Sequence, residues 1–388
     1  MSRPVSTAPL PDARRLAAYV VERVLTEEAW AAAVLRSEID RYPQLDARDR
    51  GLCTELTYGT LRTARYLESR LSKHSHRGLD TIDATTRSHL LIGAYQLLFL
   101  ERVPAHAAVS STVAALKTER GVKVGSFANA ILRRIASEVA ESGRLSVADA
   151  VFQGSPRWLR RALGASLGDS EIQEFLSAGP FPPPIGLRVR RGDRETWMTR
   201  LQEALPDAEI FPGKVEQACI LLRGAGDPRR WPGIEDGSLV IQEEGSQKVA
   251  SFLNAQTNER VLDACAGRGH KSLSLADRVG PDGRVEVADV DGRKLDHLTA
   301  EAEQIGVKIR AVHEVDLSVG LGSIPEAAFD RVLVDAPCSG LGTVRRRPEI
   351  LLRRKVDQLA EITALQTAIL NNAARAVRPG GELVHAGV

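Results

Sequence analysis

The feature that most restricts the fold is the alternation of short apolar runs with helical stretches in the last 150 or so residues of the chain. Strand-like runs occur at 239–242, 260–266, 284–290, 309–315, 329–337 and 381–388. Helical stretches at 245–254, from 271, at 293–305 and at 356–377 separate them, with short connections. This order is typical of a parallel sheet with crossover helices. We therefore predict a doubly wound, Rossmann-like α/β domain over residues 237–388.

The residues before 237 show a different pattern of apolar and polar residues. Apolar residues recur at spacings of three and four from about residue 13 to 141, and no convincing strand interrupts them. Residues 142–236 then hold one short helix, a proline run and a stretch of alternating apolar and polar residues. With 388 residues, the chain is long enough for three such parts. We predict an all-α bundle over 1–141 and a linker with a small α/β connector over 142–236.

Charge and cysteine content exclude several classes of protein. The net charge is only +2, although residues 1–150 hold 21 Lys and Arg against 17 Asp and Glu. That mild excess fits either a bundle with solvated charged faces or a nucleic-acid-binding domain. The four cysteines are far apart and form no Cys/His pattern, which argues against disulfides and a metal site. The longest apolar run, 90–100, is about half a membrane span. We expect a cytoplasmic protein without membrane contact.

A glycine-containing loop, VLDACAGRGHKS at 261–272, joins a predicted strand to a helix. At the carboxyl end of a strand, glycine lets backbone N–H groups approach a ligand closely, and Gly267 and Gly269 suit this use. Ser272 stands where a dinucleotide fingerprint has its third glycine, which disfavours NAD. Asp289, at the end of the next predicted strand, is placed to accept hydrogen bonds from a ribose. The pattern favours binding of a nucleotide or an adenosyl-type ligand over an ordinary strand-helix turn.

A second motif, FDRVLVDAPCSGLGTVRRRPEI at 329–350, is more specific. It places a carboxylic acid, Asp335, and a thiol, Cys338, at a proline turn after a strand. Such a pair suits attack on a pyrimidine, because sulfur can add to C6 while the acid hydrogen-bonds the N3/N4 edge. The alternative for Cys338 is a buried small hydrophobe. The basic cluster Arg345, Arg346 and Arg347 is either a solvated face or a set of phosphate contacts, and we favour the latter.

These motifs resemble those of the ribosomal RNA cytosine-5 methyltransferases of the RsmB (Fmu, Sun) type, within the NOL1/NOP2/Sun group. DAPCSGLGTVRRRPEI is similar to the family's DAPCSGxGxxRRxPD segment, and VLDACAGRGHK to its VLDxCAAPGGK loop. RDRGLCTELTYGTLR and LIGAYQLLFLERVPAHAAVSSTV resemble its NusB-like helical domain, and VIQEEGSQKVA resembles the start of its catalytic domain. The resemblance covers nearly the whole chain.

The resemblance implies a cofactor, a partner and a set of site residues. The cofactor would be S-adenosylmethionine, with Asp289 at its ribose and Asp316 near its adenine. Asp335 would touch the target cytosine and the ligand, and Cys338 would help expel the product. The methionine portion would lie on Cys265, Ala266, Gly267, Arg268, Gly269, His270 and Lys271. The NusB-like domain would bind 16S ribosomal RNA, free or in an early assembly intermediate, and we expect a monomer.

Two departures from the family pattern shape the hypotheses. The loop has Arg268 and His270 where the family has proline and glycine. The family's covalent nucleophile lies in a Thr-Cys-Ser segment after a strand of type GGxLVYATCS, whereas this chain reads GGELVHAGV. The leading hypothesis is a methyltransferase whose sequence lacks that segment through truncation or a frameshift. The others are a non-catalytic RNA-binding or ribosome-assembly factor and an enzyme in which Cys338 is itself the nucleophile.

Overall fold

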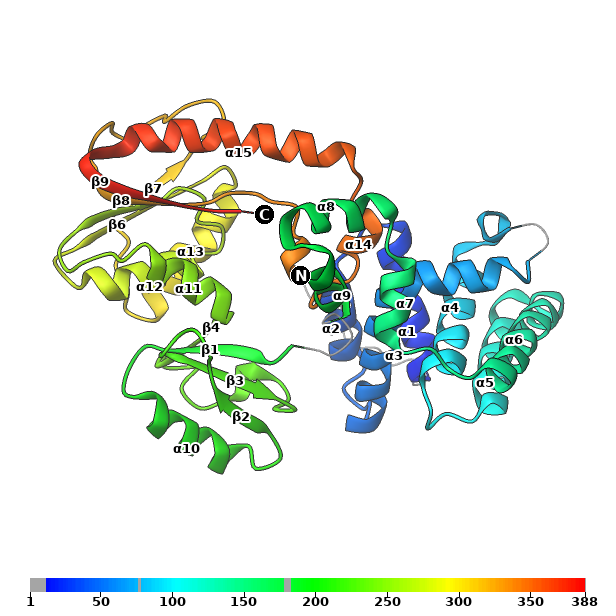
Figure 1. Ribbon diagram of the computed structural model, residues 1–388. Coiled ribbons are helices and arrows are strands. Elements are labelled where there is room, and N and C mark those ends of the chain that lie inside the picture. The colour runs from blue at the N-terminus through cyan, green and yellow to red at the C-terminus, as the bar shows by residue number, and fades with distance from the viewer. Residues whose placement is uncertain (1–11, 76–77, 178–182, 388) are drawn as a thin grey trace. The chain divides into compact units, whose positions relative to one another are not determined.

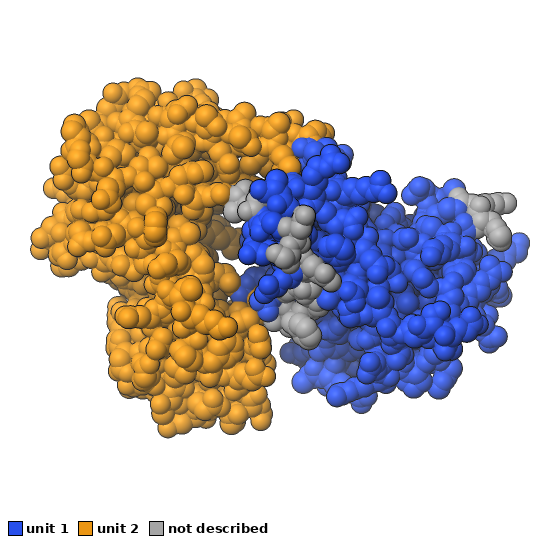
Figure 2. All heavy atoms as spheres, viewed as in Figure 1, with its two compact units in different colours: residues 1–182, 340–356 blue, residues 183–339, 357–388 orange. Residues whose placement is uncertain are grey.

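The computed structural model describes residues 12–75, 78–177 and 183–387. The chain divides into two compact units, which Figure 2 shows in different colours. A helical unit comprises the described residues of Met1–Pro182 together with Gly340–Val356. A sheet unit comprises Pro183–Ser339 and the described residues of Asp357–Val388. Each unit is therefore built from segments that are separated in the sequence.

The helical unit is helical throughout the residues described. Its helices are α1 (Ala13–Thr26), α2 (Ala31–Arg41), α3 (Ala47–Ser72), η1 (Leu79–Thr81), α4 (Ala84–Phe99), α5 (Ala105–Arg120), α6 (Val122–Ser142), α7 (Val147–Gly154), α8 (Arg157–Leu167), α9 (Asp169–Ser177), η3 (Leu341–Thr343) and α14 (Ile350–Arg353) (Figure 1). Aspartates begin several of these helices, because a carboxylate can accept from the free N–H groups of a first turn. Asp46, for example, accepts from the backbone N–H of Asp49 at 2.7 Å.

Helix α4 lies at the centre of this bundle and is buried almost all round. Leu90, Leu91 and Ile92 belong to its buried face, and they form part of one core with α1, α3, α5 and α6. This explains the apolar run at 90–100. Helix α3 approaches α4 closely at Gly59, where a Cβ atom would lie 2.0 Å from the ring of Tyr95. Within the described residues, no helix is long and apolar enough to cross a membrane.

The segment 340–356 packs into the helical unit through buried apolar and polar contacts. Its apolar side chains share a core with α7, α8 and α9: Leu341, Val344, Ile350 and Leu351 lie with Val151, Leu159, Leu163, Ile172 and Leu176. Glu349 is 1% exposed and accepts a hydrogen bond from the backbone N–H of Ala31 at 3.0 Å. Arg62 of α3 donates to the carbonyl of Arg345 at 3.0 Å. The segment is thus an integral part of this unit.

The sheet unit contains two sheets. Its elements are β1 (Ile185–Val189), α10 (Arg194–Ala204), β2 (Glu209–Pro212), β3 (Cys219–Arg223), η2 (Pro228–Arg230), β4 (Leu239–Ile241), α11 (Glu244–Phe252), β5 (Arg260–Asp263), α12 (His270–Val279), β6 (Arg284–Asp289), α13 (Gly292–Gln304), β7 (Ala311–Glu314), β8 (Phe329–Asp335), α15 (Asp357–Ala376) and β9 (Val377–Ala386). The smaller sheet is antiparallel with the order β2-β3-β1-β4. The larger is parallel with the order β7-β6-β5-β8-β9.

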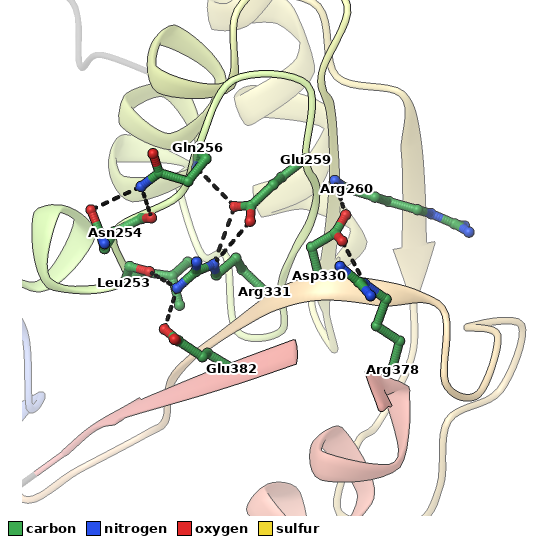
Figure 3. Close-up of polar contacts among 9 residues, drawn as sticks. All are labelled: Leu253, Asn254, Gln256, Glu259, Arg260, Asp330, Arg331, Arg378 and Glu382. Carbon is green, nitrogen blue, oxygen red and sulfur yellow. Dashed lines mark hydrogen bonds and ion pairs between the residues drawn. The ribbon is translucent and has the colours of Figure 1, made fainter. Parts of the chain in front are cut away.

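A cluster of charged residues fixes the amino-terminal ends of the central strands (Figure 3). Arg331, 12% exposed at its side chain, donates to Glu259 at 3.1 Å and to the carbonyl of Leu253 at 3.2 Å, and it pairs with Glu382 of β9. Asp330 accepts from the backbone N–H of Arg260 at 2.7 Å and also pairs with Arg378. These contacts join β5, β8 and β9 at one end of the sheet. They therefore fix the register of the three strands, and with it the position of their carboxyl ends.

The units divide the chain differently from the three parts predicted. Residues 142–177 form helices that belong to the helical unit, because their apolar faces pack against its segment 340–356. Residues 183–236 belong instead to the sheet unit. Arg188 and Arg190 of the small sheet pair with Asp277 of α12 at 2.7 and 2.8 Å, which ties that sheet to the parallel sheet. Residues 340–356 were predicted within the α/β domain, but they belong to the helical unit.

Candidate cofactor and catalytic site

One edge of the parallel sheet gathers a carboxylate from each of four neighbouring strands. Asp263 ends β5, Asp289 ends β6 and Asp335 ends β8, while Asp316 follows β7 by two residues. Because the strands are parallel and adjacent, these ends lie at the same edge. A cavity of about 180 Å³ opens there, lined by Ser246, Asp263, Asp335 and the whole loop 265–271. The edge is therefore built to bind a polar ligand.

The loop at 265–271 has the backbone that its glycines predict. Gly267 and Gly269 have φ angles of +56° and +85°, in the left-handed region that favours glycine. A Cβ atom on Gly269 would lie 2.3 Å from Leu298 Cγ, whereas one on Gly267 would meet nothing within 4 Å. Gly267 therefore leaves open space for a ligand. The Gly267 N–H also donates to Asp289 Oδ2 at 2.8 Å, which joins the loop to the end of β6.

Asp289 is almost fully engaged with the backbone. It is 9% exposed, and its Oδ1 accepts from the N–H of Asp291 at 2.9 Å. Each carboxylate oxygen can accept a further hydrogen bond, so ribose hydroxyls can still donate to it. Val290, the next residue, is 64% exposed beside this acid. An exposed apolar side chain at the end of a buried strand suits the face of an aromatic base.

Asp263 is a site residue that the sequence reasoning missed. It is 1% exposed, its Oδ2 accepts from Ser272 Oγ at 2.7 Å, and its Oδ1 is buried without a hydrogen-bond partner among the described residues. Burial raises its pKa to about 6, and the nearby charge of Asp335 adds to the effect. An unsatisfied buried carboxylate oxygen in a cavity wall indicates a polar or cationic ligand. Its place in VLDACAG, at the strand end, was the available signal.

Lys271 and Asp335 form an ion pair across the site. Their side chains are 17% and 37% exposed, so the pair faces the cavity rather than open solvent. Three residues further along, Cys338 is half-buried. A hydrogen bond from α15 stabilises the turn that contains Cys338, since Gln366 donates to the carbonyl of Pro337 at 2.9 Å. The sheet unit thus supplies both the acid and the thiol of the second motif.

The other predicted residues differ in exposure. Burial raises the pKa of Cys265 to about 12, so its thiol stays protonated at neutral pH. Arg268 and His270 are exposed on the loop. Asp316 is also exposed, and the Ser318 hydroxyl, donating at 2.6 Å with the Ser318 N–H at 2.9 Å, lowers its pKa. Of the predicted cofactor residues, the loop and Asp335 therefore line the cavity. Asp289 is joined to the loop through the Gly267 N–H, and Asp316 lies at the neighbouring strand end.

The three arginines at 345–347 belong to the helical unit. Arg345 and Arg346 are half-buried, and Arg347 is exposed. Burial lowers the pKa of Arg346, which remains a cation at neutral pH. Arg347 lies over the ring of Trp30 at 5.1 Å from its centroid. The sequence placed these residues in the catalytic domain because it could not show that 340–356 returns to the helices.

Metal and disulfide chemistry have no visible basis in the part of the chain that the structure describes. No group of three or more His, Cys, Asp or Glu there could hold a metal ion. All four cysteines, Cys53, Cys219, Cys265 and Cys338, are free.

A parallel sheet of this order, with a glycine loop after its first strand and an acid after its second, is a doubly wound α/β domain that binds its ligand at the carboxyl ends of the strands, as an α/β methyltransferase binds S-adenosylmethionine. The orphaned oxygen of Asp263 and the open space at Gly267 fit that polar, cationic cofactor. Family comparison agrees: the family described as 16S rRNA methyltransferase RsmB/F matches residues 250–388, and the NusB family matches residues 11–137.

Relatives extend the match to nearly the whole chain. Ribosomal RNA small subunit methyltransferase B of Xylella fastidiosa is 34% identical over 97% of this chain and 84% of its own length. The protein of the same description from Citrobacter koseri is 30% identical over 96% of this chain and 86% of its own. The chain therefore belongs to the family of small-subunit ribosomal RNA methyltransferases B, and its cofactor is S-adenosylmethionine.

Solved structures support the fold. The crystal structure of PH0851 has a TM-score of 0.79 with 21% identity and covers 98% of this chain and 87% of that one. NSun6 from Pyrococcus horikoshii has a TM-score of 0.52 with 16% identity and covers 60% of this chain and 83% of that one. At these identities, the likeness concerns the arrangement of helices and strands.

Proposed function

We propose that this protein methylates carbon 5 of a cytosine in 16S ribosomal RNA. The observation that carries the proposal is the turn at 335–338, which places Asp335 at the end of β8 and Cys338 three residues further, with Lys271 paired to Asp335. The family supports an RNA methyltransferase, and this acid and thiol favour a pyrimidine ring as the target. The enzyme would act in the cytoplasm on RNA whose base is exposed or splayed out of its stack.

The proposal gives each residue of the site a role. S-adenosylmethionine supplies an electrophilic methyl group when bound. Asp335, held beside Lys271, would hydrogen-bond the N3/N4 edge of cytosine and orient the ring. Addition of a thiolate to C6 would make C5 nucleophilic, and C5 would take the methyl group that the cofactor supplies. Transfer of the C5 proton to a base and breaking of the C6–S bond, which releases the thiolate, would then restore the aromatic ring. Cys338 would take part in this sequence either as the attacking thiol or in expelling the product.

A methyl-transfer assay tests the proposal. The chain is incubated with labelled S-adenosylmethionine and unmodified small-subunit RNA, and the modified nucleoside is identified. We expect label on C5 of cytosine, with loss of most activity in Asp335→Asn and a changed rate in Cys338→Ser. Binding of the cofactor, measured by calorimetry, is the control that the site is intact. Label on another atom or base, or full activity without Cys338, would contradict the assignment.

A second candidate is an RNA-binding or ribosome-assembly factor without catalysis. It is favoured by one observation, since GGELVHAGV aligned on the family's GGxLVYATCS puts Gly387 and Val388 at the threonine and cysteine positions. The corresponding strand is β9, whose Ala386 pairs with Asp335 of β8. Tight RNA binding with no detectable affinity for S-adenosylmethionine in calorimetry would identify this candidate. A covalent adduct with 5-fluorocytosine RNA that disappears in Cys338→Ser would exclude it.

A further inference from the structure

The most distinctive surface feature of the helical unit is an exposed tryptophan whose ring is contacted by two arginines. Trp30 lies just before α2 and is 47% exposed. Two guanidinium groups contact its ring, those of Arg347 and Arg353, each 5.1 Å from the centroid. The two arginines come from the segment 340–356, more than 300 residues further along the chain. We call the group Trp30, Arg347 and Arg353 the Trp30 platform.

The platform is held rigidly from both sides. Arg353 donates through Nη2 to the carbonyl of Val24 at 3.3 Å and to that of Ala29, so its guanidinium is fixed beside the ring. On the other side, Glu349 accepts from the N–H of Ala31, the residue after Trp30. A tryptophan fixed in place loses little conformational entropy when a partner covers it. Its large exposed surface is therefore prepared for a ligand.

We propose that the Trp30 platform binds a single-stranded segment of the substrate RNA, with a base stacked on the exposed surface of Trp30 and Arg347 and the adjoining phosphates near the arginines. This inference rests on the proposed RNA substrate and names where the helical unit holds it. An aromatic ring interleaved with cations is the combination that single-stranded RNA requires, since every base offers a π face and every nucleotide a negative charge. The family's RNA substrate favours this occupant over an acidic protein segment.

Substitution of the ring gives the first test. RNA affinity is measured without cofactor, using an unmodified small-subunit RNA transcript and a short single-stranded RNA. We expect Trp30→Ala to weaken binding about 5- to 150-fold, whereas Trp30→Phe keeps most of the affinity because it keeps a stacking face. Arg347→Gln should lower the slope of log affinity against log salt by about 0.7. Phe127→Ala and Arg134→Gln, at exposed positions of α6, are matched controls expected to bind as the unaltered chain does.

Fluorescence of the unaltered chain gives a second test that does not depend on a variant's folding. Of the four tryptophans, Trp197 and Trp231 are 7% and 3% exposed and Trp158 is half-buried, so Trp30 dominates quenching by acrylamide. Saturating RNA should protect that component, and Trp30→Phe should remove it. Equal affinity of Trp30→Ala and the unaltered chain, undiminished quenching at saturation, or failure of the chain to bind either RNA would overturn the inference. Normal RNA binding without methyl transfer would overturn the proposed function instead.

Discussion

The buried carboxylate of Asp263 makes the stability of the sheet unit depend on pH. Its pKa rises from 3.8 to about 6, mainly because burial disfavours the charged form. A group whose pKa is raised by folding stabilises the protein fully below its unfolded pKa, and that stability is lost as the pH rises through the folded pKa. For Asp263 the loss begins near pH 4 and is complete above pH 6.

The size of the effect follows from the two pKa values. At about 1.36 kcal/mol per pH unit, the rise to about 6 corresponds to about 3 kcal/mol of unfolding free energy. About 2 kcal/mol of this falls between pH 4.5 and 7.5. Asp263→Asn removes the charge and keeps the shape, so its stability relative to the unaltered protein should rise by about 2 kcal/mol across that range. Other titrating groups are common to both proteins and cancel in the comparison.

Chemical denaturation of both proteins at several pH values, without cofactor, measures this difference. Ser272→Ala is an opposite test, because it leaves the carboxylate but removes the hydrogen bond that lowers its pKa, so this variant should lose more stability than the unaltered protein as the pH rises. Asp263→Asn should also weaken S-adenosylmethionine binding by about tenfold, since it removes a charged acceptor from the cavity wall. If the stability difference between Asp263→Asn and the unaltered protein is the same at pH 4.5 and pH 7.5, the carboxylate does not titrate as argued and the reasoning fails.

Three other substitutions test the packing around the sites. Gly269→Ala should destabilise the protein by at least about 2 kcal/mol and abolish cofactor binding. The residue has a left-handed backbone that alanine adopts only with strain, and the new Cβ atom would clash with Leu298. Calorimetry showing normal cofactor binding would contradict this prediction. Glu349→Ala should cost about 1–3 kcal/mol, since it leaves the Ala31 N–H without its buried acceptor, and denaturation followed by helical circular dichroism measures it. Arg331→Met should lower stability by about 1–3 kcal/mol while cofactor affinity changes little, and a large loss of affinity would show that the charged cluster reaches the site.

The sequence predicted the parallel sheet, the helical bundle and the cofactor loop because each has a local periodicity or a glycine signal. Gly267 and Gly269, with Asp289 at the expected strand end, needed no tertiary information. Asp263 was missed because an acid inside an apolar run is read as the end of a strand, and only the structure shows its unsatisfied oxygen. The contact between Arg347 and Trp30 was not predicted, because the two residues are more than 300 positions apart and such a contact produces no periodic pattern in the sequence.

The return of the segment 340–356 to the helical unit has a consequence for how the protein is made and how it can evolve. The chain crosses between units after residues 182, 339 and 356, so the helical unit cannot complete its core until the ribosome has synthesised most of the catalytic sheet. A fragment ending near residue 182 would leave Val151, Leu159 and Leu163 without the apolar side chains of 340–356 that share their core. The helical unit therefore cannot be exchanged between proteins as one continuous segment. Recombination at the proline run, 180–184, would separate this unit from residues 340–356, which form part of its core.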